Sequence, residues 1–259
     1  MDMKTRKRYL MFLAASVAMI FVMLMPCTPT QAAKKSVYVV AKIKGQYDTK
    51  NYSYNSSGFV TSVKSSSKDI GKITYKYNSK NRIISSSAKA ADYNIAQEMT
   101  YKGGKLFTVR EERNYSDWNS SNVTTYTWEK GRCTKEITKY SGDSYKSAYK
   151  YKYYKNGYIK SVNAAGPMDS LNYDSKGNVS KLKHESADEP AYVSTYTNNY
   201  KNGLLISQKV EMKDDEVGTI KHTIKYNYKK IKVDQKYLKR IKAQQRRIIT
   251  DIGPNLAVY

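Results

Sequence analysis

A short pattern of aromatic, polar and apolar positions recurs along the middle of the chain. Aromatic residues two apart, as in Tyr52 and Tyr54, precede a polar cluster that ends in Gly or Asn, and two apolar residues follow. Side chains two apart share one face of a β-strand, and Gly and Asn tolerate the positive φ of hairpin turns. The pattern therefore predicts successive β-hairpins. Their turns are expected 20 to 27 residues apart, at Gly58, Asn81, Gly104, Gly131, Gly157, Gly177 and Gly203.

Spacing within these units predicts two turn types and a bulge. In some units the Gly or Asn comes four residues after the last aromatic, and in others it comes three after it. The apolar residues that follow are three apart, as in Leu106 and Val109, and a bulge just after the turn would bring both to one face. Cys133 takes the first of these apolar positions. We therefore expect it to be a small buried side chain rather than a reactive thiol.

The N-terminal segment, residues 1–33, has the pattern of a secretory signal peptide. Basic residues precede an apolar run from Leu10 to Met25, and small residues allow cleavage after Ala32 or Ala33. The run is shorter than the roughly 20 residues of a membrane-spanning helix. We therefore expect export and no transmembrane span in the mature chain.

A helical period replaces the strand pattern after Val233. Apolar residues recur at three- and four-residue steps up to Ile249, and Asp234 is expected to cap a helix that ends near Thr250. We expect this helix to pack on the last edge of the sheet and cover its unpaired backbone groups. Alternatively, it contacts an anionic polymer or membrane surface. The candidate polyanion-binding residues are Lys239, Arg240, Arg246 and Arg247.

Charge and tyrosine content dominate the composition. The 259 residues include 46 Lys and Arg against 22 Asp and Glu, a net charge of +24, and 26 are Tyr. Without residues 1–33, which hold four basic residues and Asp2, 42 basic residues face 21 acidic ones, a net charge of +21. Tyrosine favours strands and can bury its ring while its hydroxyl stays in water. A folded domain with a core built largely of tyrosine is expected.

Candidate chemistry is sparse. His184 and His222 are the two histidines, with no metal-ligand spacing, and both are expected to be solvated strand residues. The acidic cluster 214–216 does not match a calcium loop and is expected to be a solvated connection. No nucleophile elbow or phosphate-binding glycine loop occurs. We expect no catalytic residues, no metal site and no cofactor.

The repeated unit, of which Tyr173-Asp-Ser-Lys-Gly177 is the clearest example, resembles the YD repeats of Rhs-type secreted bacterial proteins. The resemblance covers roughly residues 44–233. It implies an all-β fold, a curved antiparallel sheet of about seven hairpin repeats, followed here by a basic amphipathic helix. The expected domains are a signal peptide (1–33), a hairpin repeat domain (34–233) and a C-terminal helix and tail (234–259).

These features predict a secreted, non-catalytic protein associated with the cell envelope or wall. A strongly basic surface concentrates polyanions by salt-sensitive attraction, so an anionic wall polymer or glycan is the expected partner. Nucleic acid is not expected, because an exported protein rarely meets it. One alternative is an extracellular scaffold or adhesin that binds a surface protein. Another is a secreted hydrolase, since scattered carboxylates could meet in space.

Overall fold

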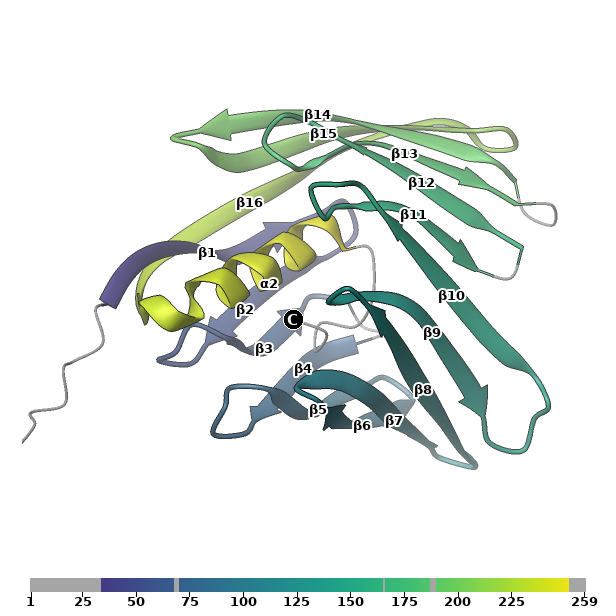
Figure 1. Ribbon diagram of the computed structural model, residues 1–259. Coiled ribbons are helices and arrows are strands. Elements are labelled where there is room, and N and C mark those ends of the chain that lie inside the picture. Colours follow the sequence, from purple (N-terminus) through teal and green to yellow (C-terminus); the bar gives the residue numbers. More distant parts are fainter. Residues whose placement is uncertain (1–33, 68–69, 165, 187–189, 252–259) are drawn as a thin grey trace, which may run out of the picture. The chain divides into compact units, whose positions relative to one another are not determined.

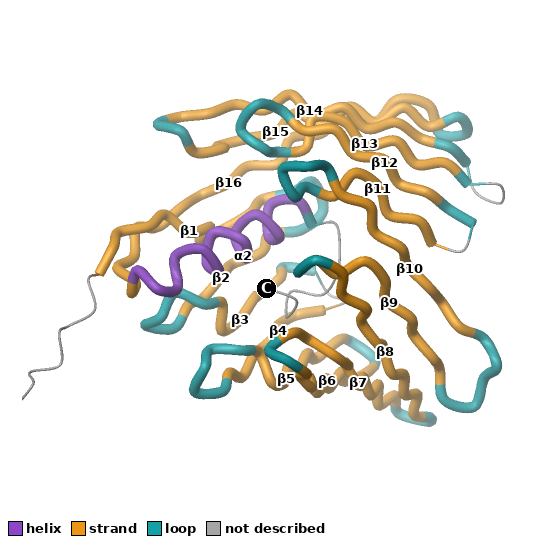
Figure 2. Tube along the Cα trace, in the orientation of Figure 1, coloured by secondary structure: helices purple, strands orange, loops and turns teal. Residues whose placement is uncertain are grey.

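The computed structural model describes residues 34–67, 70–164, 166–186 and 190–251. The predicted signal peptide, residues 1–33, and the end of the tail, residues 252–259, lie outside this part of the chain. Most of the described residues lie in strands (Figures 1 and 2). The first eight are β1 (Lys34–Lys44), β2 (Thr49–Tyr54), β3 (Val60–Ser65), β4 (Ile70–Tyr77), β5 (Ile83–Ala90), β6 (Tyr93–Lys102), β7 (Lys105–Tyr115) and β8 (Asn119–Glu129). The next are β9 (Arg132–Tyr140), β10 (Lys146–Tyr153), β11 (Ile159–Ala164), β12 (Met168–Tyr173), β13 (Val179–Glu185), β14 (Tyr192–Lys201), β15 (Leu204–Asp214) and β16 (Gly218–Asp234). The short 3₁₀ turn η1 (Gln235–Tyr237) and the helix α2 (Leu238–Thr250) follow.

These described strands form one closed antiparallel barrel. Each strand pairs with its neighbour in sequence, and β1 closes the ring by pairing with β16, from Lys34 opposite Asp234 to Lys44 opposite Lys225. The prediction of a curved sheet of about seven YD-like hairpin repeats is therefore wrong. Residues 34–44 lack the turn pattern, yet they pair with residues 225–234 and so remove both sheet edges.

The turns within this barrel lie where the sequence pattern placed them. Each predicted turn residue has a positive φ, from 55° at Asn81 to 91° at Gly157. Two turn types occur. Tight turns have two residues between paired strand ends, as between Lys102 and Lys105, and longer ones are closed by hydrogen bonds such as Asn55 N to Phe59 O.

A register shift follows each of these seven turns, which confirms the predicted bulge. In β2 and β3, for example, Tyr54 pairs with Val60 while Ser53 pairs with Ser62. The shift brings both apolar residues after the turn to the inner face of the barrel, where Leu106 and Val109 are both buried.

Aromatic side chains tie neighbouring hairpins together at these bulges. The last aromatic residue of one strand donates a hydrogen bond to a backbone carbonyl of the preceding hairpin, an arrangement that we call the aromatic clasp. Seven clasps have donor–acceptor distances of 2.6 to 2.9 Å: Tyr54 to Val40, Tyr77 to Val60, Tyr101 to Ile83, Trp128 to Leu106, Tyr153 to Cys133, Tyr173 to Ile159 and Tyr228 to Leu205. The eighth aromatic, Tyr200, bonds the Asp174 carboxylate instead. The indole N–H of Trp128 replaces a phenol without loss of the donor, so the clasp explains which aromatic residues fit this position.

Removing one clasp should measurably weaken the barrel. Tyr173→Phe deletes the hydroxyl that donates to Ile159 O at 2.9 Å, and we expect the free energy of unfolding to fall by about 1 kcal/mol in urea denaturation. Tyr47→Phe is the matched control, because Tyr47 is 86% exposed. Equal effects of the two substitutions would show that the clasp does not stabilise the fold.

The two faces of the barrel wall differ in chemistry. In β10, Tyr151 and Tyr153 pack into the core on the inner face, whereas Lys150 and Lys152 are exposed on the outer face. Because side chains alternate along a strand, this places apolar and aromatic groups inside and many lysines outside. The tyrosine-rich core expected from composition is therefore present.

The helix α2 lies against the inner face of the barrel, beside β1 and β2 (Figure 1). Ile241 packs with Val39, Phe59 and Val233, and Ile248 packs with Val40 and Val60. The prediction that the helix covers a sheet edge is wrong, because β1 and β16 leave no edge to cover. Its apolar stripe instead completes the core from within.

Glutamine side chains fix the helix to the wall. Gln245 Oε1 accepts a hydrogen bond from Val40 N at 2.7 Å, and Gln244 Oε1 accepts one from Val60 N at 3.1 Å. Both valines lie at register shifts, where the regular ladder is interrupted. The two glutamines thus satisfy backbone donors at the bulges. Asp234 precedes η1 but makes no capping hydrogen bond, so the predicted cap is wrong.

Candidate functional site

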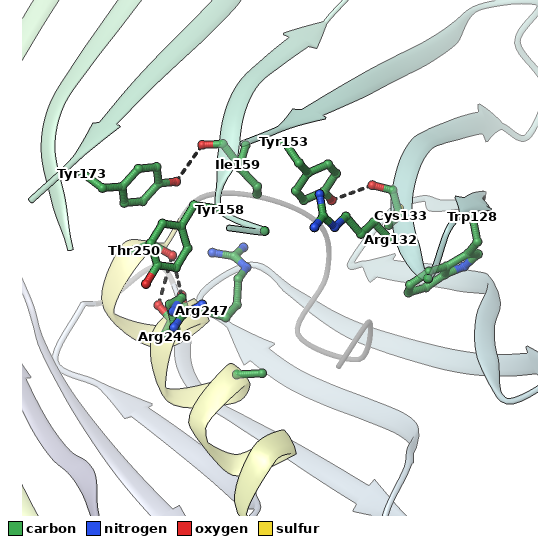
Figure 3. A pocket seen from close by; sticks show the side chains of 13 residues that line it. Trp128, Arg132, Cys133, Tyr153, Tyr158, Ile159, Tyr173, Arg246, Arg247 and Thr250 are labelled. Atoms are coloured by element: carbon green, nitrogen blue, oxygen red, sulfur yellow. Dashed lines mark hydrogen bonds between the residues drawn. The ribbon is translucent and has the colours of Figure 1, made fainter. Parts of the chain in front are cut away.

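A cavity of about 180 Å³ lies between the C-terminal half of α2 and the barrel wall (Figure 3). Its wall comes from β8 to β12, including the turns at Gly131 and Gly157. Three guanidinium groups line it, those of Arg132, Arg246 and Arg247, and we call it the arginine cavity. Its aromatic lining is Trp128, Tyr153, Tyr158 and Tyr173.

The three arginines are held in different ways. Arg246 lies over the ring of Tyr158, with its Cζ 4.4 Å from the ring centroid. Arg132 donates to Tyr154 O at 3.3 Å and lies over the Tyr153 ring. Arg247 forms an ion pair with Asp251, with 3.7 Å between Nη1 and Oδ1. Cation–π contacts leave guanidinium N–H groups free for a ligand, and the guanidinium group of Arg246 makes no hydrogen bond to any described residue.

The aromatic lining is rigid. Trp128, Tyr153 and Tyr173 each use their polar atom in an aromatic clasp, which fixes the ring toward the cavity. Tyr158 lies 4.9 Å from Tyr173 between ring centroids. A Cβ at Gly177 would collide with the Tyr158 hydroxyl, so glycine is needed there both for its positive φ and for this contact.

The arrangement favours an anion. None of the described residues that line the cavity is acidic, and of its three guanidinium groups the one of Arg247 has a carboxylate, that of Asp251, beside it. Planar guanidinium groups match phosphate and carboxylate oxygens with paired hydrogen bonds. Aromatic faces beside them can contact the flat side of an attached group. The cavity is therefore suited to a small anionic group joined to a less polar body.

The structure divides the four candidate polyanion-binding residues. Arg246 and Arg247 line the arginine cavity, whereas Lys239 is exposed outside it. Arg240 turns to the β4–β5 turn, where it donates to Asn81 O at 2.7 Å. Sequence reasoning missed Arg132, which directly follows the turn at Gly131, because no local pattern links that turn to the distant helix.

Other candidate residues have structural roles. Cys133 is 2% exposed and burial raises its pKa to about 12, which confirms a buried, protonated thiol. The expected solvated position of His184 is wrong, because its ring is buried, 2.7 Å from Asp169 Oδ1 and stacked on Tyr192. The Asp214 carboxylate accepts a hydrogen bond from Val217 N and so closes the exposed β15–β16 turn, as expected of a solvated connection. The described residues contain no cluster of three or more potential metal ligands of the His, Cys, Asp and Glu types.

None of the helices in the described part of the chain is long and apolar enough to cross a membrane.

No protein-family model matches the chain, and no curated protein matches it. Among solved structures, a porin-like protein from Bacteroides uniformis is similar, with 14% identity over 73% of this chain and 96% of that one. The TM-score is 0.32. The resemblance to YD repeats gains no support, and the closed barrel contradicts the curved repeat sheet that it implied.

Proposed function

We propose that the chain is an exported, non-catalytic protein of the cell envelope that binds an anionic wall polymer or glycan. The arginine cavity carries this proposal. It brings three guanidinium groups from two distant parts of the chain against one aromatic wall, with no acidic lining residue in the described structure. A ligand that is both anionic and ring-bearing satisfies both halves of that lining.

The outer face of the barrel supports the same partner. Exposed lysines alternate with inward tyrosines, and residues 34–259 have a net charge of +21. Such a surface attracts a polyanion from a distance, and salt strongly screens this attraction. We assign to it the encounter with the polymer, and to the arginine cavity the recognition of an individual unit.

Co-sedimentation with isolated bacterial walls tests the proposal. Purified protein is mixed with walls that retain their anionic polymers and with walls from which these have been extracted, at ionic strengths from about 0.05 to about 0.5 M. We expect binding only to the intact walls, and we expect it to weaken steeply with salt. Equal binding to both preparations, unaffected by salt, would contradict the proposal and favour a protein partner of an adhesin or scaffold.

A further inference from the structure

A second cavity lies between α2 and β2 to β6, with a volume of about 340 Å³. Its lining includes Tyr52, Tyr75, Ser86 and Gln97, and we call it the hydroxyl cavity. Arg247 lines both cavities, so the two adjoin at this side chain. A ligand in the arginine cavity therefore has the hydroxyl cavity beside it.

The hydroxyl cavity has less positive charge in its lining than the arginine cavity. Its charged lining residues are Lys50, Arg247 and Asp251. Asp251 lies 3.7 Å from both Lys50 Nζ and Arg247 Nη1, so its carboxylate offsets one of the two positive charges. Burial raises the pKa of Tyr75 to about 12 and raises that of Tyr52 further, so both phenols stay protonated. This differs from the arginine cavity, where no acidic residue contributes to the described lining.

Unused hydrogen-bonding groups line this cavity. The hydroxyl groups of Tyr52 and Tyr75 make no hydrogen bond to any described residue, unlike the tyrosines of the aromatic clasps. Ser86 donates to Gln97 Oε1 at 2.7 Å, and Gln97 Nε2 donates to Glu111 Oε2 at 2.6 Å. That network fixes the amide orientation and leaves the second Gln97 N–H without a partner among the described residues. Half-buried polar groups with unused bonding capacity favour a hydroxyl-bearing ligand.

We propose that the two cavities together hold one phosphorylated hexose unit, with its phosphate in the arginine cavity and its sugar ring in the hydroxyl cavity. The sizes agree. With volumes of about 180 and about 340 Å³, the smaller cavity has room for a phosphate group and the larger one has room for a hexosyl ring. The inference rests on the proposed function and names the unit that the site recognises.

Isothermal titration with inorganic phosphate and with glucose 1-phosphate tests this inference on the purified protein and on the double variant Tyr52→Phe/Tyr75→Phe. We expect glucose 1-phosphate to bind at least tenfold more tightly than phosphate, and the double variant to lose about tenfold for glucose 1-phosphate only. The deleted hydroxyls have no partner in the described protein, so the variant should keep its stability. Tyr47→Phe is the matched control, because Tyr47 is exposed.

The outcomes separate the two proposals. If phosphate binds but glucose 1-phosphate binds no better, or if the double variant weakens both ligands equally, the second subsite is wrong and the proposed function stands. If neither compound binds, the arginine cavity is not an anion site and both proposals fail. A competition arm distinguishes a free sugar phosphate from a polymer unit, because glucose 1-phosphate should release the protein from walls only if the polymer occupies the same site.

Discussion

Replacing Ile241 by alanine should lower the free energy of unfolding by about 2–5 kcal/mol. Ile241 is 0% exposed and packs with Val39, Phe59 and Val233, so the smaller side chain leaves a void between the helix and the wall. The effect should be large because no sheet edge or second layer offers the helix an alternative position. Urea denaturation of the purified protein gives the comparison directly.

Lys242→Ala is the control for that substitution. Lys242 is the next residue on the same helix and is exposed, so its loss should change stability by less than about 0.5 kcal/mol. Equal effects at the two positions would mean that α2 does not pack inside the barrel. We also expect Ile241→Ala to weaken anion binding, since Arg246 and Arg247 reach the arginine cavity only from a correctly seated helix.

Arg246→Gln should weaken phosphate binding about 10- to 100-fold. Hydrogen bonds to charged groups contribute about 1.5–3 kcal/mol each, and every 1.4 kcal/mol is about a factor of ten in affinity. The guanidinium group of Arg246 is held by the Tyr158 ring and makes no hydrogen bond to a described residue, so its loss should leave the fold intact. Titration calorimetry at fixed ionic strength measures the change, with unfolding free energy as the check on folding.

Lys239→Gln separates a local site from the general charge. It removes the same unit charge from the same helix, at an exposed position outside the arginine cavity. We expect less than about a twofold loss of affinity, because exposed charges act through screened, long-range attraction. If this substitution weakens phosphate binding as much as Arg246→Gln does, the binding reflects net charge alone.

Local features of this fold were predictable because one short stretch of chain determines each of them. The turn at Gly131 needs a positive φ, and Gly after a polar cluster marks it in the sequence. The bulge between Tyr101 and Leu106 was visible in the spacing of three between the apolar residues Leu106 and Val109. The helix was predictable because apolar residues recur at three- and four-residue steps, and its C-terminal end falls at Thr250 as expected.

Closure of the barrel and assembly of the arginine cavity bring together residues that are far apart in the sequence. Local sequence patterns therefore could not show either feature. Nothing in residues 34–44 marks residues 225–234 as their partner, and an array with two free edges has the same local pattern as a ring. The helix face could cover an edge or an interior equally well. Gln244 and Gln245 were the only local signal, since two amides on a buried face need backbone partners. Arg132 joined the site only when closure brought its turn to the helix.

Pairing of β1 with β16 also sets the order in which this protein can assemble. The partners Lys34 and Asp234 are 200 residues apart, whereas the other strand pairs are sequence neighbours. Neighbouring hairpins form within microseconds, but bringing distant ends together costs more chain entropy and slows folding. We therefore expect folding to run through an open, unclosed intermediate with a late final step. Of the described strands, β1 is synthesised first, but its pairing with β16 can form only after the rest of the barrel has been synthesised.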